Sequence, residues 1–505
     1  VMVFLAACGG SGGGSSSGGS SSSSGSSGSI GSSSSGGGGT LPDDETGPIN
    51  DPVSYQWDPN NFTHLYEVGP GRDYADPNEV PWESLAPSTL VRIYYRDTPY
   101  RTKWVINVTA TADAPVVVLG VASDGHRPMI TGEDATTRQA LDYWNENRSV
   151  IKIGGSSIPD NDAGPAYIYV QGLDIRCARP AYSFTDDSGQ VSTFSDNAAA
   201  IHVEAGDAIF IQDCILHDAG NGLFSGAASS RLTISGNYIY DNGIDASIYE
   251  HNSYTESQGI IFQYNHYGPL RSGCLGNNLK DRSSGTIIRC NWIEGGNRQL
   301  DLVETDYDYI ASDPDYDATF VYGNVLIEPE GAGNSQILHY GGDGGNEAMY
   351  RRGTLYFYHN TVVSTRGENT TLLRLSTTDV QAQVFNNILF VTATGDHMAI
   401  TSGNGQTTLF GNWLPSEWRL THESDLEPGA SVTDAGNVEG VNPGFVDLGT
   451  QDFHLAQDAE AGNAAAALPT AVDTHPVEYQ YLKHQQYETR PTDGTVDIGA
   501  FEIYP

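Results

Sequence analysis

Several short apolar segments of this chain each carry one polar side chain that could take part in catalysis. Leu, Ile, Val or Tyr flank that side chain, as in Leu300-Asp301-Leu302 and Leu338-His339-Tyr340. Alternate residues of a β-strand take opposite faces, so the apolar neighbours are expected to point inward and the polar residues outward. The outward set comprises His202, Lys280, Asp301, His339 and Arg374.

Tyr254 is expected to join this set because of its spacing. Tyr254 and Lys280 each lie 11 residues before an asparagine, Asn265 and Asn291 respectively. Outward strand residues are usually polar in any protein. A row that mixes Tyr, Lys, Asp, His and Arg is less routine and indicates a candidate functional site.

These residue types suit elimination across the C4–C5 bond of a uronic acid. That reaction needs a cation to neutralise the carboxylate, a base to remove the C5 proton and an acid to protonate the leaving oxygen. We expect Lys280 to be the base, with its pKa depressed by the nearby Arg282. Tyr254 or His339 is the expected acid, and Arg282 is expected to hold the carboxylate at the reacting sugar.

Further residues are expected to bind the substrate or a metal ion. The predicted substrate-binding residues are His202, His251, Arg298 and Arg374. Asp301 and Glu304 could bind Ca²⁺ that bridges to a uronate, because hard cations take oxygen ligands. Their spacing of three places both on one face only if the strand bends or ends between them.

A recurring asparagine indicates the fold that would position these residues. The recurring positions, with steps of 24, 28, 26, 33, 36, 26 and 26 residues, are Asp213, Asn237, Asn265, Asn291, Asn324, Asn360, Asn386 and Asn412. A short apolar strand beside each marker at such a period predicts a solenoid, here an all-β, right-handed parallel β-helix. Asn suits the inner corner of each coil because its amide can bond the same amide on the coils above and below.

Insertions and charge indicate where a ligand would bind. Long insertions at residues 243–258, 305–318 and 342–353 fall beside the polar row and are expected to wall a cleft. The formal net charge is −39 with only 24 Lys plus Arg, which argues against nucleic-acid binding. Five basic residues nevertheless fall within 28 positions, namely Arg271, Lys280, Arg282, Arg289 and Arg298. An acidic polysaccharide is therefore the expected partner, with the protein acting as a monomer.

The N-terminal sequence indicates export. Leu5-Ala6-Ala7-Cys8 resembles a bacterial lipobox, so residues 1–8 are interpreted as the end of a lipoprotein signal peptide. Residues 9–49 are expected to form a Gly/Ser-rich tether, and residues 50–505 the β-helix domain. The expected location is the cell envelope of a bacterium, with an outer-membrane lipid anchor on Cys8 as the only membrane contact. The other cysteines, Cys177, Cys214, Cys274 and Cys290, could be buried thiols or disulfides.

Two segments resemble a known family. Asn278-Leu279-Lys280-Asp281-Arg282-Ser283, followed by residues 286–293, is similar to the active-site coils of β-helical polysaccharide lyases of the alginate lyase and chondroitinase B type. The resemblance implies a polysaccharide lyase in which Lys280 is the base. Residues 497–502 are similar to the closing coil of exported bacterial β-helix proteins.

Two alternatives remain at this stage. A glycoside hydrolase on the same scaffold would need a carboxylic acid and a second carboxylate about 5–10 Å apart, which Asp301, Glu304 and Glu256 could provide. A surface adhesin or glycan-binding module would use the same row only to bind.

Overall fold

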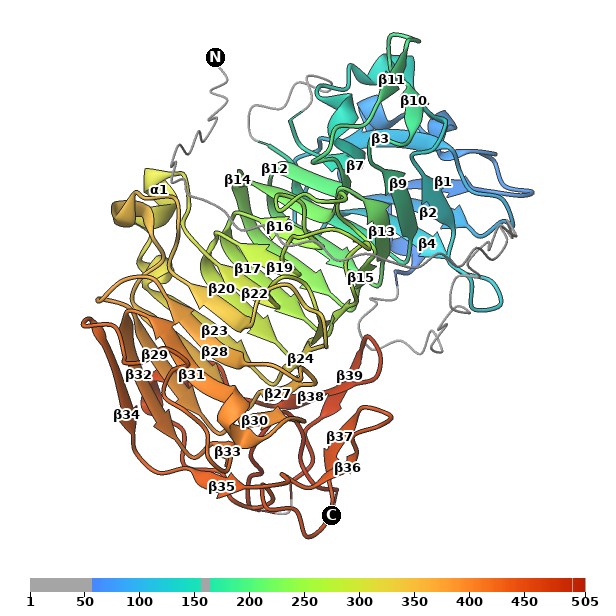
Figure 1. Cartoon of the computed structure of the whole chain (residues 1–505). Coiled ribbons are helices and arrows are strands. Elements are labelled where there is room, and N and C mark those ends of the chain that lie inside the picture. The colour runs from blue at the N-terminus through green and yellow to red at the C-terminus, as the bar shows by residue number, and fades with distance from the viewer. Residues whose placement is uncertain (1–56, 156–163, 493, 505) are drawn as a thin grey trace, which may run out of the picture. The chain divides into compact units, whose positions relative to one another are not determined.

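The computed structural model describes residues 57–155, 164–492 and 494–504, all within one compact unit that spans Thr46–Pro505. These residues form a parallel β-helix, which confirms the predicted fold (Figure 1). A typical coil adds one strand to each of three parallel ladders in turn. The predicted lipobox and tether lie outside the described residues.

The first ladder begins with β1 and continues to the last coils. Its members are β1 (His64–Val68), β2 (Thr89–Tyr94), β4 (Val116–Val121), β8 (Ala166–Gln171), the later parts of β12 (Ala199–Gln212) and β14 (Asn221–Ser235), β17 (Gln258–Gln263), β20 (Ser284–Arg289), β23 (Ala318–Tyr322), β26 (Thr354–Tyr358), β29 (Gln381–Phe385), β32 (Gly405–Phe410) and β34 (Ala430–Asp434).

The second ladder follows the asparagine corner. It runs through β5 (Met129–Thr131), β9 (Asp174–Ala178), β13 (Ile215–Ala219), β15 (Tyr238–Tyr240), β18 (His266–Tyr267), β21 (Trp292–Glu294), β24 (Val325–Glu328), β27 (Thr361–Ser364), β30 (Ile388–Val391), β33 (Trp413–Pro415) and β35 (Val438–Gly440).

The third ladder carries the polar row predicted from the sequence. It consists of β3 (Thr102–Ile106), β7 (Ser149–Ile153), the first parts of β12 and β14, β16 (Ser253–Thr255), β19 (Leu279–Asp281), β22 (Leu300–Leu302), β25 (Gln336–Tyr340), β28 (Thr370–Leu375) and β31 (Met398–Gly403). The apolar residues of these strands, such as Leu279, Leu300 and Leu338, are fully buried in the core between the ladders.

Helices are few and short among the described residues. The one α-helix is α1 (Asp308–Ala311), and the 3₁₀ turns are η1 (Pro59–Asn61), η2 (Pro77–Glu79), η3 (Trp82–Ser84), η4 (Gln139–Leu141), η5 (Glu146–Arg148), η6 (Pro314–Asp317), η7 (Glu347–Met349), η8 (Gly395–His397) and η9 (Thr470–Val472). In the described part of the chain, no helix has the length and apolar character needed to cross a membrane.

The asparagines stack along the corner between the first and second ladders. Asn291, for example, donates from both its backbone N and its Nδ2 to Oδ1 of Asn324, at 2.9 Å each. It accepts in turn from Asn265 Nδ2 at 2.9 Å. Asn291 and Asn324 are fully buried, so every coil satisfies polar groups of the next coil that water cannot reach.

Two marker positions predicted from the sequence are wrong by one residue. Asn387, not Asn386, accepts from the amide of Asn360, and Cys214, not Asp213, donates its amide to Asn237. Asp213 and Asn386 instead take the left-handed conformation that precedes the corner, with φ of 50° and 57°. Asn and Asp are tolerated there because their short side chains fit the αL region.

The C-terminal segment packs along the outside of the second ladder. It includes the antiparallel hairpins β36 (Phe445–Asp447) with β37 (Asp452–Leu455) and β38 (Tyr479–Leu482) with β39 (Gln486–Thr489). Trp292 of β21 stacks on Phe453 at 5.4 Å between ring centroids. Residues 497–502 form no strand, and the amide of Ala500 donates to Thr361 Oγ1 at 3.0 Å. The prediction that residues 497–502 form a closing coil is therefore wrong, because this segment lies against the side of the coils.

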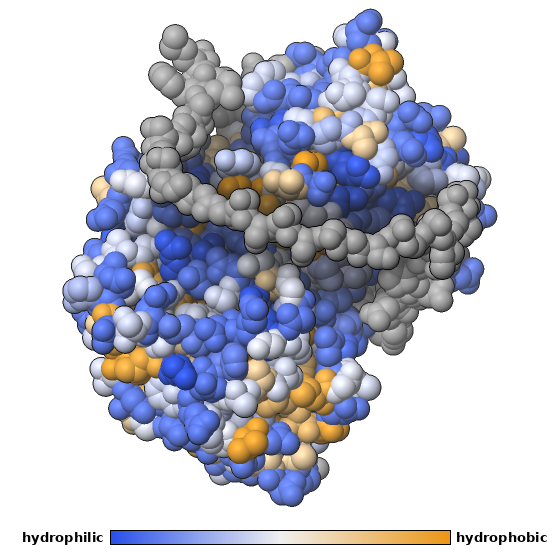
Figure 2. All heavy atoms as spheres, in the orientation of Figure 1, coloured by the Kyte–Doolittle hydropathy of each residue, from blue (hydrophilic) through white to orange (hydrophobic). Residues whose placement is uncertain are grey.

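Three other strands form a small extension near the N-terminal coils: β6 (Ala135–Thr137), β10 (Ser183–Thr185) and β11 (Val191–Thr193). All four described cysteines are free thiols. The face in view in Figure 2 is mostly hydrophilic, in keeping with the acidic composition.

Candidate active site

The third ladder places the predicted outward residues side by side. The register pairs Tyr254 with Lys280, Lys280 with Asp301, Asp301 with His339, and His339 with Arg374. Upstream, the same row continues through Lys152, His202 and Phe224. The common spacing missed Phe224 because it lies 13 residues before Asn237, where β12 and β14 share a register shift. We call this line of residues the polar row.

Exposure divides the site residues predicted from the sequence into two sets. Four side chains are partly exposed, namely Tyr254, Lys280, Arg282 and Arg374. The predicted residues that are buried, with 8% exposure or less, are His202, His251, Arg298, Asp301, Glu304 and His339. The first set, which we call the accessible group, presents surface to a ligand, whereas the second set supports it from below.

Asp301 is the centre of the buried set. Its carboxylate lies 3.2 Å from Lys280 Nζ, 2.9 Å from His339 Nδ1 and 3.7 Å from Arg298 Nη1. It also accepts from Asn277 Nδ2 at 2.7 Å. Burial opposes ionisation of Asp301. The hydrogen bond from His339 and the charge of Lys280 outweigh this effect and hold the pKa of Asp301 well below its usual range.

The same ion pair changes the expected state of Lys280. Burial alone would lower the pKa of Lys280, but the charge of Asp301, followed by Tyr254, outweighs burial and raises it. The expectation of a depressed pKa is therefore wrong, because Arg282 contributes less than the carboxylate at 3.2 Å. Lys280 is an ammonium ion at neutral pH in this arrangement.

Tyr254 lies between cations and has an unused hydroxyl. The Nζ of Lys280 and the Cζ of Arg282 each lie 5.6 Å from the Tyr254 ring centroid. Within the described part of the chain, the Tyr254 hydroxyl has no hydrogen-bond partner. A hydroxyl at this position, beside two cations, is placed to exchange a proton with a ligand.

His251 supports Tyr254 from the side. The two rings meet edge-to-face at 5.2 Å between centroids, and His251 Nδ1 accepts from the amide of Asn277 at 2.9 Å. Burial, with the charge of Lys280, lowers the pKa of His251 to about 3. His251 is thus neutral, with its proton on Nε2, and it shapes the site rather than contacting a ligand.

The insertions at residues 243–258 and 305–318 contact each other beside the row. Arg282 Nη1 pairs with Asp306 at 2.5 Å, and the buried Glu256 accepts from Thr305 Oγ1 at 2.5 Å. Burial raises the pKa of Glu256. Within α1, Tyr309 donates its hydroxyl to the carbonyl of Ala227 at 2.8 Å, which ties this insertion back to β14.

The residues predicted to hold calcium do not fit that role. Glu304 accepts from the backbone amides of Gly344 at 2.7 Å and Asp343 at 3.3 Å, and Asp301 is surrounded by cationic and hydrogen-bond donors. No group of three His, Cys, Asp or Glu side chains within residues 57–155, 164–492 and 494–504 could hold a metal ion. We derive no step through calcium.

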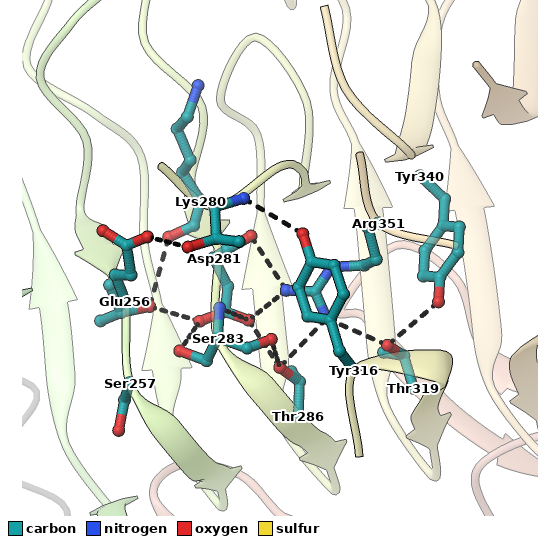
Figure 3. A network of polar contacts seen from close by, with 12 residues as sticks. Glu256, Ser257, Lys280, Asp281, Ser283, Thr286, Tyr316, Thr319, Tyr340 and Arg351 are labelled. Atoms are coloured by element: carbon teal, nitrogen blue, oxygen red, sulfur yellow. Dashed lines mark hydrogen bonds and ion pairs between the residues drawn. The ribbon is translucent and has the colours of Figure 1, made fainter. Parts of the chain in front are cut away.

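A second polar network lies on the interior side of β19. Asp281 and Arg351 are both fully buried and pair at 3.0 Å, and in Figure 3 they point toward one another while Lys280 extends away. Asp281 also accepts from Thr255, Ser283 and Thr286 at 2.7–2.8 Å. Arg351 Nη1 also donates to Thr286 and Thr319, while its Nε has no hydrogen-bond partner among the described residues. The buried pair holds β19 in place, and so fixes where Lys280 emerges.

The sequence did not indicate Arg351, which lies in the insertion at residues 342–353. The sequence also predicted that five basic residues would lie together, but the coils separate them. Arg271 pairs with Asp218 at 2.5 Å, and Arg289 donates to Gln263 at 2.6 Å, both away from the polar row. Of the five, only Lys280, Arg282 and Arg298 reach the row.

Comparisons with known proteins give only distant structural likenesses. No protein-family model matches the chain, and no curated protein matches it. Among solved structures it is similar to an alginate lyase from Paenibacillus sp. str. FPU-7, with 11% identity over 71% of this chain and 94% of that chain and a TM-score of 0.42. The pectate lyase Pel9A gives 10% identity over 87% and 96%, with a TM-score of 0.43. A lacto-N-biosidase from Eubacterium ramulus gives 11% over 75% and 68%, with a TM-score of 0.43. At these values the likenesses carry no argument about the activity of this chain.

Proposed function

We propose that the protein is a carbohydrate-active enzyme that cleaves an acidic, uronate-containing polysaccharide by β-elimination. The observation that carries the proposal is the accessible group, in which the free hydroxyl of Tyr254 lies among the cations Lys280 and Arg282. Arg374 follows further along the same row, and its guanidinium has no hydrogen bond or ion pair with another described residue. Adjacent strands lie about 4.8 Å apart, so the row from Tyr254 to Arg374 spans about 19 Å, which suits a chain-like substrate.

The cations supply the electrostatic part of the reaction. Elimination develops negative charge on the uronate as the C5 proton leaves, and positive side chains nearby stabilise that charge. Arg282 and Lys280 would face the reacting uronate, and Arg374 a carboxylate further along the polymer. In a chain of net charge −39, a stripe of cations attracts a polyanion to this face while the remaining surface repels it.

Proton transfer is assigned to Tyr254 and Lys280. Because Lys280 is held protonated by Asp301, we assign it as the acid that protonates the leaving oxygen rather than as the base expected from the sequence. Tyr254, in its phenolate form, then removes the C5 proton. His339 has no role in this scheme, since both its ring nitrogens are hydrogen-bonded within the protein.

The hydrolase alternative has less support. It needs one carboxyl group that can donate a proton and a second that acts as base or nucleophile. Asp301 is held ionised and its oxygens are engaged by Lys280, His339 and Asn277. Glu256 has a raised pKa, but its Oε1 already accepts two hydrogen bonds, from Thr305 and Asp306.

The test is an assay of the purified protein on a panel of uronate polymers, followed by the ultraviolet absorbance of unsaturated sugar ends. Elimination predicts that absorbance grows on at least one polymer with the wild type and not with Lys280→Met. Cleavage without absorbance would favour a hydrolase. Binding without any product would favour a glycan-binding protein.

The lipobox-like segment supports a second, separate proposal about location. We propose that a lipid on Cys8 anchors the protein to the outer membrane of a bacterial cell envelope. Cys8→Ser should move the protein from the membrane fraction to the soluble fraction without changing its activity, and retention in the membrane would contradict the anchor.

A further inference from the structure

Ser376, His339 and Asp301 form a continuous hydrogen-bonded chain at the C-terminal part of the polar row. Ser376 Oγ lies 2.9 Å from His339 Nε2, and His339 Nδ1 lies 2.9 Å from Asp301 Oδ1. The three residues come from, or directly follow, the successive strands β28, β25 and β22. A hydroxyl, an imidazole and a carboxylate in this order are the groups that activate a serine nucleophile.

The surrounding contacts fix the direction in which each hydrogen points. Asp301 is ionised beside Lys280 and Arg298, so His339 presents the N–H of its Nδ1 to that carboxylate. His339 Nε2 is then an acceptor. The amide of Gly342 donates to Ser376 Oγ at 3.0 Å, which leaves the Ser376 hydroxyl proton to point at Nε2.

The backbone at Gly341 passes close to the side chain of Ser376. Gly341 has φ of 131°, and a Cβ placed there would lie 2.6 Å from Ser376 Oγ. Only glycine therefore lets this turn pass over the serine. Ser376 is partly exposed, and His339 is fully buried directly behind it.

A positive group stands beside this chain. Arg374 pairs in register with His339, and its guanidinium makes no hydrogen bond or ion pair with another described residue. Such a guanidinium can stabilise the oxyanion that forms when a carbonyl is attacked. The elimination scheme uses neither Ser376 nor His339, so this chain is unexplained by the proposed function.

We propose that Ser376 is the nucleophile of an acyl-transfer site, with His339 as its base and Asp301 as the group that orients the base, and that the substrate is a carboxylic ester on a glycan. The choice of a glycan ester rests on the proposed function, whereas the assignment of the nucleophile does not. Removing ester substituents would expose the polymer that the accessible group binds.

The reaction balances with water as the co-substrate. Ser376 Oγ attacks the ester carbonyl carbon and passes its proton to His339 Nε2. The bond from that carbon to the alcohol oxygen breaks, and the oxygen takes the proton from His339. Water then attacks the acyl-serine in the same way, releasing the carboxylic acid and restoring Ser376.

Covalent labelling tests the nucleophile on the intact protein. The full chain is incubated with a fluorophosphonate probe, and the adduct is located by peptide mass spectrometry. The proposal expects one adduct, on Ser376, in the folded protein and none after heat denaturation. An unlabelled wild type, or a label on another residue, would overturn it, and this outcome does not depend on any variant folding.

Ester hydrolysis tests the activity and the source of the ester. Wild type and Ser376→Ala are compared on 4-nitrophenyl acetate, on an acetylated uronate polymer with acetate measured, and on a methyl-esterified one with methanol measured. We expect Ser376→Ala to lose at least about 100-fold of the ester activity. Acetate release identifies an O-acyl substituent and methanol release a uronate ester, whereas release of neither by the wild type overturns the glycan-ester assignment.

A third readout separates this inference from the proposed function. Ser376→Ala should keep the wild-type rate of absorbance increase on an unesterified polymer, because Ser376 is outside the elimination scheme. Equal loss of both activities with an unchanged unfolding midpoint would contradict two separate chemistries. If Ser376 is labelled but no polymer is cleaved by elimination, the assignment of the nucleophile is supported and only the proposed elimination is contradicted.

Discussion

The asparagine corner and the polar row both run along the coils with one residue per coil, yet they differ in what repeats. At the corner, the same residue recurs, fully buried, and each amide bonds its copy on the next coil. Along the row each coil carries a different residue, namely Tyr254, Lys280, Asp301 and His339. Lys280 and His339 both contact Asp301, whereas the Tyr254 hydroxyl has no hydrogen-bond partner among the described residues. Repetition of one residue indicates a structural role, whereas variation at the same register indicates chemistry.

Two lysines within the polar row sharpen this distinction. Lys152 has a fully buried side chain, pairs with Glu204 at 2.5 Å and donates to the carbonyl of Trp144 at 2.7 Å. Burial lowers the pKa of Lys152. Lys280 keeps 17% of its side chain exposed and its pKa is raised. The same register position thus holds a buried lysine in one coil and, in another, the partly exposed Lys280 to which we assign the role of acid.

The largest effect is expected from Tyr254→Phe. Removing the hydroxyl removes the proposed base and should lower the elimination rate by about 10²–10⁴-fold, with little change in the unfolding midpoint. Initial rates and thermal unfolding measure the two quantities. Tyr249→Phe is the matched control, since Tyr249 is 71% exposed and should keep full activity. More than a tenth of the wild-type rate in Tyr254→Phe would exclude it as the base.

Breaking the buried pair beneath the row should cost stability instead. Arg351→Met leaves the Asp281 carboxylate buried without its cation, and should lower the free energy of unfolding by about 3–5 kcal/mol. Arg352→Met is the control, because the adjacent Arg352–Asp317 pair is exposed and should be worth less than about 1 kcal/mol. Urea unfolding measures both, and equal losses would show that the buried pair does not support β19.

The asparagine corner should be sensitive at any coil. Asn291→Leu removes partners from Asn265, Asn324 and the carbonyl of Phe262, and should cost about 2–4 kcal/mol. Asn346→Leu, at an exposed position in the insertion, should change stability by less than about 0.5 kcal/mol. A tolerated Asn291→Leu would mean that the corner is held by the strands alone.

The buried His251 should make stability depend on pH. Its pKa is about 3 in the fold against 6.5 in an unfolded chain, so the unfolded state binds more protons between these values. Stability is therefore lost as pH falls from 6.5 toward 3. In His251→Asn, which keeps an acceptor for Asn277, the loss between pH 6.5 and 4 should be smaller than in the wild type. Parallel stability curves would contradict a neutral buried imidazole.

The smallest effect is expected from chelation. Because Asp301 and Glu304 are engaged by groups of the protein itself, an excess of EDTA should leave both the elimination rate and the unfolding midpoint unchanged. A loss of activity that added Ca²⁺ restores would show that the carboxylates rearrange to bind the ion after all.

The sequence predicted the register of the fold and of the row because both follow from local periodicity. Alternation placed Lys280 and His339 on one face, and the repeat placed them on nearby coils. It could not predict which side chains are covered, or that Arg351 would reach Asp281 across 70 residues. Those contacts depend on how the insertions close, which no periodicity encodes. The same limit explains why Ser376, just past the end of β28, was missed.

The central claim is elimination by Tyr254 and Lys280, and the products formed in water labelled with heavy oxygen test it most directly. Elimination breaks the glycosidic bond without adding water, so the new ends should carry no label and one product should contain a C4–C5 double bond. Mass spectrometry of the oligosaccharides reads both features. Heavy oxygen at a new reducing end, with no unsaturated partner, would identify hydrolysis and contradict the account.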